Sequence, residues 1–301
     1  MGLHSASATE LPQWLSTKAS SSPRRRVWRR FTRHRLAMVS LGLLLMIGVT
    51  VLAAPLVTSY SPTKSSGSLE SGPSRTHLLG TDRLGRDIWA RLVYGGRVSL
   101  SVGIVAVSIS TAIALVLGTL SGYYGRWVDM LIMRVTDVMM VFPSLILVMV
   151  VVSLIGPSIY NVMAVIGFLS WTGTARLLRG QILSVREWDF VTAARCMGVP
   201  DRRIMFRHIL PNALAPLLVA ATFGVAGAIL TEAGLSYLGL GVLPPAPSWG
   251  NMLNGAQSVR ILESFWWLWL PPGMAIFVTV LSINFVGDGL RDALDPRTSL
   301  D

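Results

Sequence analysis

The sequence has few charged side chains for its length. Asp, Glu, Lys and Arg make up 14% of its 301 residues, whereas hydrophobic residues make up 52%. A soluble globular protein has about a quarter of its residues charged, because these side chains cover the surface that faces water. The shortage of charge therefore excludes an ordinary soluble globule of this size and indicates a surface that contacts lipid.

Cysteine is nearly absent as well. The one cysteine, Cys196, excludes an intramolecular disulfide and a cysteine-based zinc site built from this chain alone. We interpret it as a small helix residue. The histidines form no HExxH pair, and Leu238 stands where the nucleophile elbow of a hydrolase needs glycine. A membrane-bound enzyme or scaffold is therefore the least favoured class.

The net charge of +11 raises the question of nucleic-acid binding. A DNA-binding domain sets its basic residues on a stripe interleaved with polar ones, and it lacks long apolar runs. Here the arginines lie between apolar runs, as the charges of loops do. The sequence therefore predicts no nucleic-acid partner.

Six apolar runs have about the length that a membrane-spanning helix requires, roughly 20 residues. They lie at residues 36–58, 98–123, 131–155, 159–178, 212–235 and 266–286. The first run is longer than the core of a signal peptide and lacks a convincing cleavage site after it, so we expect a retained anchor. The sequence predicts an all-α, polytopic membrane protein with about six transmembrane helices.

Basic residues indicate which side of the membrane each segment faces. Short cytoplasmic loops hold an excess of Lys and Arg, and both the N-terminal tail at 1–35 and the loop at 185–211 have this excess. An even number of spans then places both termini in the cytoplasm. The loop at 59–97 is an exception, since it carries six basic residues yet falls on the outer side.

The loop after the fourth span has the pattern of two short helices joined by a turn. Gly198 followed by Pro200 is typical of a helix end, where glycine takes the left-handed conformation and proline blocks continuation. We expect Asp201 to cap a second short helix that runs to Leu210 and is broken by Pro211. Such a pair either lies on lipid headgroups or docks a soluble partner.

The residues of this loop resemble the cytoplasmic signature of ABC importer permeases, in which Glu-Ala-Ala is followed by Gly and then by Leu-Pro. The matching residues are Ala193, Ala194, Gly198, Leu210 and Pro211. Two positions depart from the pattern. Thr192 stands in place of the Glu, which removes one charge contact to an ATPase, and His208 stands in place of an aliphatic residue.

Three further stretches resemble the peptide and nickel branch of this family, and in particular the C-type permease of the oligopeptide and dipeptide systems. One is the outer-loop run from His77 to Asp87, rich in Gly, Arg and Asp. The second runs from Leu235 to Gly241 and on through a proline-rich turn to Gly250, and the third is the C-terminal run from Arg291 to Arg297. The resemblance covers nearly all of the chain from Arg35 onward.

The resemblance implies a type I ABC importer permease fold and a division of the chain. The expected parts are a cytoplasmic tail at 1–35, a first transmembrane helix at 36–58, an extracytoplasmic loop at 59–97, a permease core at 98–288 and a cytoplasmic tail at 289–301. It also implies that the loop at 185–211 is the coupling helix that enters a groove on an ATPase. Thr192, Ala193, Ala194, Gly198, Asp201, His208, Leu210 and Pro211 carry that role by resemblance.

The same resemblance implies the partners and the cargo. The chain is expected to pair with a homologous second permease, two ATP-binding subunits that hold ATP and magnesium, and an extracytoplasmic solute-binding protein, in the plasma membrane of a bacterium or archaeon. The chain itself is expected to hold no cofactor and catalyse no reaction. Peptides are the expected cargo, with nickel or glutathione as alternatives, and a secondary transporter is the alternative class.

Some ionisable residues inside or beside spans are candidates for function, because charge in a membrane is costly. We expect Arg134 and Asp137, one turn apart, to neutralise each other. Glu232, late in the fifth span, either lines the translocation path or satisfies backbone groups of the following loop, and we favour the structural role. The outer-loop glycines lack the Lys-Ser or Lys-Thr of a phosphate-binding loop, so nucleotide binding is not expected there.

Overall fold

The longest helix of the protein, α4, runs from Ile88 to Tyr124 and packs against α7, α8 and α11. The carboxylate of Asp87 caps its first turn by accepting a 2.7 Å hydrogen bond from the Ala90 N–H. At about 1.5 Å per residue α4 extends roughly 55 Å, more than the roughly 30 Å of a bilayer's hydrocarbon core. The helix begins at Ile88, within the segment 59–97 that was expected to be the outer loop, so the irregular part of that segment ends at Asp87.

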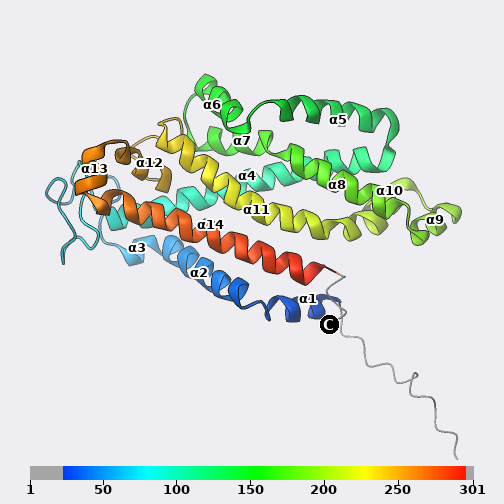
Figure 1. Cartoon of the computed structure of the whole chain (residues 1–301), viewed down its shortest axis with the longest axis horizontal. Coiled ribbons are helices and arrows are strands. Elements are labelled where there is room, and N and C mark those ends of the chain that lie inside the picture. The colour runs from blue at the N-terminus through cyan, green and yellow to red at the C-terminus, as the bar shows by residue number, and fades with distance from the viewer. Residues whose placement is uncertain (1–22, 296–301) are drawn as a thin grey trace, which may run out of the picture.

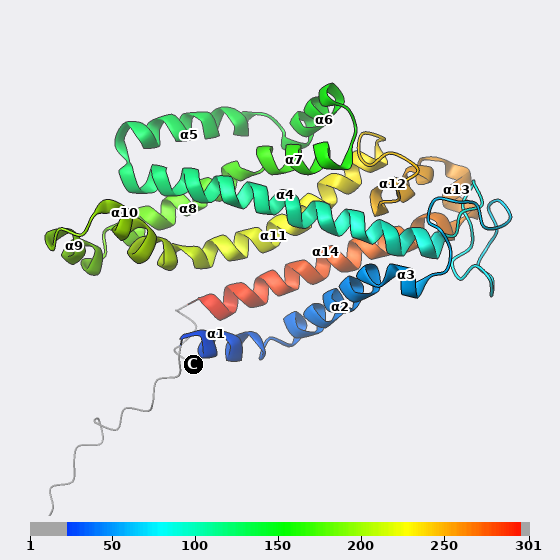
Figure 2. The same ribbon diagram turned by 180° about the vertical axis from the view of Figure 1, so that it is seen from behind.

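The computed structural model describes residues 23–295, and Figures 1 and 2 show them as a bundle of long, nearly parallel and antiparallel helices. Within that range no β-strand forms, and an isolated bridge pairs Thr81 with Asp87. The predicted tails fall partly at residues 1–22 and 296–301, which lie outside the described residues.

Long helices run along the bundle and shorter ones join them. Besides α4, the long helices are α2 (Arg35–Leu52), α5 (Arg126–Val141), α8 (Trp171–Arg186), α11 (Leu210–Tyr237) and α14 (Trp266–Leu294). The shorter ones are α1 (Pro23–Phe31), α3 (Ala54–Val57), α6 (Ser144–Ile155), α7 (Ile159–Leu169), α9 (Asp189–Cys196), α10 (Asp201–Arg203), α12 (Trp249–Leu253) and α13 (Val259–Ser264), with a π-helix η2 (Ile204–Ile209) and a 3-10 helix η3 (Asn254–Gln257).

Within the described part of the chain, four helical segments are long and apolar enough to cross a membrane by length and composition. They are Arg35–Leu52, Ile88–Tyr124, Asp201–Tyr237 and Trp266–Leu294. A fifth is reached if the bent pair α5 and α6 counts as one span. The fourth expected span, at 159–178, is divided between two helices, α7 and α8, that meet at Ser170.

The expected span at 131–155 is not straight. α5 and α6 meet at Phe142 and Pro143 with a bend of 87°. Proline lacks the N–H that would continue the hydrogen-bond ladder, and its ring drives the preceding residue out of the helical region. Phe142 accordingly has ψ 136°, an extended conformation, and the apolar run divides into two helices.

The bundle has two ends, which differ in what they carry (Figures 1 and 2). At one end, which we call the α9 end, lie α9, α10, α1 and the C-terminal end of α14. At the other, the loop end, lie the loop 58–87, α12 and α13. The segment expected to contact an ATPase and the expected outer loop are therefore at opposite ends.

α8 approaches α4 closely because two glycines of α4 face it. A Cβ atom at Gly118 would lie 2.8 Å from the carbonyl oxygen of Ala175, and one at Gly122 would lie 2.9 Å from the side chain of Ile182. Ile182 has no exposed surface. The close contact fixes α8 on the bundle, and α8 leads directly into α9.

Candidate functional site

α9 ends in the turn that its residues predict. Gly198 has φ +71°, the left-handed conformation that glycine adopts without strain. Its N–H donates to the carbonyl of Arg195 at 2.9 Å, and the N–H of Val199 donates to the carbonyl of Ala194 at 3.1 Å. These two bonds form a Schellman motif, which satisfies the last carbonyls of the helix. The predicted helix followed by a glycine turn is confirmed.

α9 has one buried face and one exposed face. Val191 and Ala194 are buried in a core cluster shared with α4, α8, η2 and α11. Phe190 and Met197 lie outside this cluster, with exposed fractions of 40% and 76%. Thr192 and Ala193 are also exposed. The inner face therefore holds α9 on the bundle while apolar side chains remain on its outer face.

The second helix differs from the prediction at both ends. Pro200 occupies its N-cap position, and Asp201, in the first turn, makes no side-chain cap bond. Its carboxylate instead accepts a 2.6 Å hydrogen bond from the hydroxyl of Tyr123 at the end of α4. Pro211 does not break the helix, because it lies in the first turn of α11, and the chain stays helical from Asp201 to Tyr237.

A π-helical segment explains how the helix passes Pro211. In η2 the N–H of Leu210 donates to the carbonyl of Met205, five residues earlier. Proline in a helix leaves a carbonyl in the preceding turn without its usual donor and its ring crowds that turn. The wider turn makes room for the ring. η2, which contains His208, packs against α9, and Leu210 and Pro211 begin α11 directly after it.

An open hollow of about 550 Å³ lies beside this turn. It is lined by Pro200, Arg202, Arg203 and Phe206. The two arginines are exposed, and Phe206 has an exposed fraction of 55%. The surface next to α9 thus combines positive charge with apolar area.

Ion pairs between α5 and α8 were not found from the sequence. Asp129 accepts two 2.5 Å hydrogen bonds from the guanidinium of Arg179 and one from the Ser121 hydroxyl. Asp137 pairs at 2.6 Å with Arg176 and not with Arg134, so the predicted pairing of Asp137 with Arg134 is wrong. Asp137 pairs with a residue 39 positions away on α8, and local spacing along α5 gives no signal of such a long-range partner.

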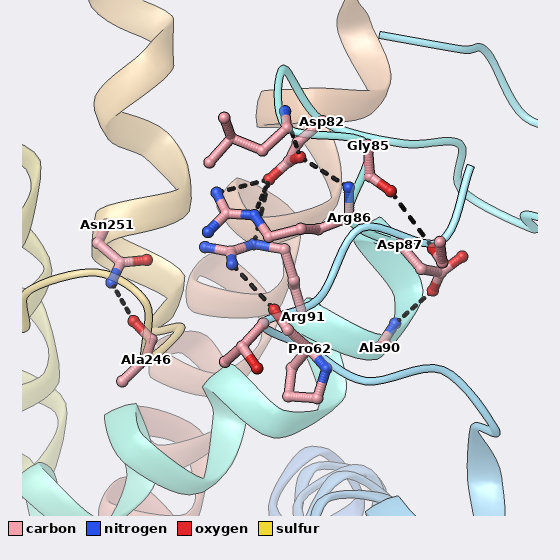
Figure 3. Close-up of polar contacts among 12 residues, drawn as sticks. Pro62, Asp82, Gly85, Arg86, Asp87, Ala90, Arg91, Ala246 and Asn251 are labelled. Atoms are coloured by element: carbon pink, nitrogen blue, oxygen red, sulfur yellow. Dashed lines mark hydrogen bonds and ion pairs between the residues drawn. The ribbon is translucent and has the colours of Figure 1, made fainter. Parts of the chain in front are cut away.

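At the loop end, a polar cluster holds the loop 58–87 onto the bundle (Figure 3). Asp82 accepts from the Nε of Arg86 at 2.7 Å, and the Nε of Arg91 lies 3.6 Å from the same carboxylate oxygen. His77 and Asp87 are joined by a buried 2.8 Å contact. The motif that resembled the peptide branch is therefore an ordered structure, with Arg91 only 4% exposed.

Glu232 lies within a buried polar network near the loop end. Its side chain has no exposed surface and accepts hydrogen bonds from the hydroxyls of Ser99 and Ser236 at 3.1 and 2.7 Å. The same hydroxyls accept from the backbone N–H groups of Trp249 and Val242. The carboxylate thus holds two serines that in turn satisfy the backbone around α12.

Across residues 23–295 no group of three or more His, Cys, Asp or Glu side chains is arranged to hold a metal ion. The site that the fold builds from the predicted residues is the exposed α9 surface with its glycine turn.

The sequence matches two known family models. Residues 114–300 match the binding-protein-dependent transport system inner membrane component, and residues 22–73 match the N-terminal transmembrane domain of oligopeptide transport permease C.

Curated relatives match over nearly the whole chain. A protein of Brucella suis named as a peptide permease is 47% identical and covers 95% of both chains. The dipeptide transport system permease protein of Alkalihalophilus pseudofirmus is 44% identical over 92% of this chain and 90% of its own. The glutathione transport system permease protein of Pectobacterium atrosepticum is 41% identical over 93% of each.

A solved structure shares the fold. An inward-facing MetNI methionine ABC transporter aligns with a TM-score of 0.55 and 18% identity, over 68% of this chain and 97% of its own. One family model covers more than half of the chain, and relatives above 40% identity cover more than nine-tenths of it. The chain therefore belongs to the family of binding-protein-dependent transport system inner membrane components, the non-catalytic permease subunits of ABC importers.

Proposed function

We propose that this chain is a permease subunit through which an ABC importer moves di- or oligopeptides across the plasma membrane of a bacterium or archaeon. The names of the relatives at 47% and 44% identity, a peptide permease and a dipeptide permease, support this cargo. The chain acts with a homologous second permease around a shared path, and lipid surrounds the long helices.

In this proposal α9 and the turn after it receive the motion of two ATPase subunits, which hold ATP and magnesium. The observation that carries the proposal is the two-sided burial of α9. Val191 and Ala194 lie in the core cluster with α4, α8 and α11, whereas Phe190 and Met197 face outward. A push on the outer face therefore moves the helices packed behind the inner face. The coupling residues are Thr192, Ala193, Ala194, Gly198, Asp201, His208, Leu210 and Pro211.

The two ends of the bundle then take opposite sides of the membrane. The α9 end, with the first and last described residues, faces the cytoplasm, where its exposed arginines accord with the positive-inside rule. The loop end faces outward and meets the solute-binding protein. We assign Glu232 to the structure of this end and not to the path, since its carboxylate is fully buried and hydrogen-bonded to Ser99 and Ser236.

Glutathione is the second candidate cargo, because a glutathione permease is 41% identical over 93% of this chain. Glutathione is itself a tripeptide, so a translocation path that accepts short peptides also suits glutathione. Uptake of labelled Ala-Phe and of labelled glutathione into vesicles that hold the complete transporter and its binding protein separates the two cargoes.

Ala193→Trp tests the coupling role. Ala193 is exposed on α9, so a large side chain is tolerated by the fold but blocks the approach of an ATPase. We expect uptake of Ala-Phe and ATPase assembly to fall at least tenfold while thermal unfolding of the chain is unchanged. The matched control is Ser184→Trp, on the exposed side of α8 just before α9, which we expect to keep both. Equal activity of the Ala193→Trp transporter and the wild type would overturn the coupling role.

A further inference from the structure

A cleft of about 310 Å³ opens at the loop end between the loop 58–87 and the short helices near α12. Its volume lies at the small end of the range of ligand sites, about 300–1,000 Å³. One wall is charged and the other largely apolar. The charged wall has Asp82, Arg83, Arg86 and Arg91, and the apolar wall has Pro244, which is exposed, and Met252, which is half-buried.

The charged wall has more positive than negative charge. Arg86 donates from Nε to Asp82 and also places its Nη2 2.7 Å from the same carboxylate, which Arg91 approaches at 3.6 Å. One carboxylate therefore faces two guanidinium groups. Arg83 is paired elsewhere, with Glu70 at 3.4 Å. The Asp82, Arg86 and Arg91 cluster keeps a surplus of one positive charge in a place where Arg91 is 4% exposed.

Arg86 and Arg91 each have a terminal guanidinium nitrogen with no hydrogen-bond partner in the described part of the chain. A guanidinium has five N–H donors and no acceptor. Arg91 uses Nη1 on the carbonyl of Pro62 at 3.0 Å, which leaves its Nη2 without a partner among residues 23–295, and Nη1 of Arg86 has none there either. In Figure 3 the two guanidinium groups lie one above the other and point to the same side, toward Asn251 at the start of α12. Nη1 of Arg86 and Nη2 of Arg91, which have no partner among the described residues, therefore lie on the same side of the cluster.

Two adjacent guanidinium groups with free N–H donors are the preferred partner of a carboxylate. An unbound surplus charge in a half-enclosed place is costly, and a carboxylate neutralises it. The apolar wall sets a second condition on the ligand, since the accessible side chains of Pro244 and Met252 can contact a hydrocarbon group but cannot pair with a second charge. The ligand is then a carboxylate with an apolar side chain next to it.

We propose that this cleft binds the C-terminal residue of a peptide, with its carboxylate on Arg86 and Arg91 and its side chain against the apolar wall. The proposal rests on the proposed function in peptide import. It makes the loop end the first site on the permease at which the peptide binds. An acidic side chain of a docking protein brings the charge alone and leaves the apolar wall unused.

The test measures binding of the dipeptide Ala-Phe and of its C-terminal amide to the full chain in lipid nanodiscs by isothermal titration calorimetry. We expect Ala-Phe to bind at least tenfold more tightly than the amide, because the amide has no charge for Arg86 and Arg91. Acetyl-glutamate amide, which has a side-chain carboxylate but no free C-terminus, is expected to bind at least tenfold more weakly than Ala-Phe.

Two variants and a control complete the test. Arg86→Gln removes one guanidinium, and Gly255→Leu fills the cleft from η3, where an added Cβ would meet only Ile261 Cδ1 at an ordinary 3.8 Å. Both are expected to weaken Ala-Phe binding at least tenfold. Arg260→Gln removes a positive charge at the same end, from a side chain that is 67% exposed and outside the cleft lining, and is expected to change binding less than twofold.

The proposal is overturned if Ala-Phe and its amide bind with equal affinity. It is also overturned if Gly255→Leu, which keeps both arginines, binds Ala-Phe as tightly as the wild type does. A third contrary result is that acetyl-glutamate amide binds as tightly as Ala-Phe. The last result would assign the cleft to an acidic side chain of a docking protein. The measurement involves neither ATPases nor transport, so its failure leaves the import function standing, and failure of the uptake assay leaves the binding result intact.

Discussion

The hydroxyl of Tyr123 donates a 2.6 Å hydrogen bond to the carboxylate of Asp201, and this bond joins the last turn of α4 to the turn that follows Gly198. Arg186 of α8 donates to the carbonyl of Tyr123 at 3.0 Å, and the guanidinium of Arg195 on α9 lies 6.0 Å from its ring. Tyr123 thus contacts α8, α9 and α10, so movement of α9 relative to α4 changes its contacts.

Tyr123→Phe removes the bond to Asp201 and keeps the ring. A hydrogen bond to a charged group contributes about 1.5–3 kcal/mol, and less where solvent screens the charge as it does at the exposed Asp201, so we expect a modest fall in the thermal unfolding temperature of the purified chain. The larger effect is expected on coupling, because α4 no longer follows the turn. The measurement is the number of ATP molecules hydrolysed per Ala-Phe imported by the assembled transporter, which we expect to rise.

Tyr124→Phe is the matched control. Tyr124 is half exposed, and its hydroxyl has no hydrogen-bond partner in the described part of the chain. Its removal is expected to leave both stability and the ATP requirement unchanged. If the two variants behave alike, the bond between Tyr123 and Asp201 has no part in coupling.

The pair Asp129 and Arg179 is expected to stabilise the fold far more than the pair Asp137 and Arg176. The first pair has two 2.5 Å hydrogen bonds and side chains only 18% and 31% exposed, whereas the second has side chains 54% and 46% exposed. Hydrogen bonds to charged groups contribute about 1.5–3 kcal/mol, and exposed ion pairs less than about 1 kcal/mol.

Asp129→Asn is therefore expected to lower the unfolding temperature clearly, and Asp137→Asn hardly at all. Thermal unfolding followed by tryptophan fluorescence in detergent micelles checks both. A double-mutant cycle with Arg179→Gln measures the coupling energy between the two side chains. Equal effects of the two Asp→Asn changes would contradict this ranking.

The parts of the site that were predictable depend on neighbours in the sequence. Gly198 and Pro200 mark the end of α9 by their own backbone preferences, so the turn and its left-handed φ could be inferred from the residues alone. The predicted apolar runs likewise place α2, α4, α11 and α14, because hydropathy over about 20 residues is a local property.

The predictions that were wrong concern features that depend on contacts between distant residues or on two conflicting signals in the sequence. Asp201 was expected to cap its own helix, but Tyr123, 78 residues away, offers a donor that local reasoning does not see. The run at 131–155 was predicted as one span from its apolar length, although Pro143 lies inside it and divides it into two helices. Pro211 was expected to end a helix, yet the π-helical turn before it absorbs the proline.

Pro211→Ala tests what the π-helical turn does. Alanine restores an N–H and removes the ring, so η2 is free to tighten to an ordinary α-helix. That change rotates the residues before it, α9 included, relative to α11. We expect unchanged or higher thermal stability together with a fall in Ala-Phe uptake of at least fivefold. The control is Pro216→Ala, a proline inside α11 with no π-helical turn before it, which is expected to keep uptake.

Glu232 distinguishes a structural carboxylate from one that attracts cargo. Its two oxygens accept from Ser99 and Ser236, and these serines accept from the N–H groups of Trp249 and Val242. Glu232→Gln keeps a side chain of the same shape with one acceptor, so we expect a folded chain and uptake within about threefold of the wild type. Glu232→Leu leaves both hydroxyls buried without an acceptor, at a cost of about 1–3 kcal/mol for each.

The measurement is uptake of Lys-Ala and of Ala-Ala, alongside thermal unfolding. A structural carboxylate predicts that Glu232→Gln changes both uptakes by the same small factor, and that Glu232→Leu lowers both together with the unfolding temperature. A carboxylate on the path predicts a selective loss of the cationic Lys-Ala in the stable Glu232→Gln variant. The full burial of Glu232 leads us to expect the first result, because a side chain with no exposed surface reaches cargo only if α4 and α11 separate.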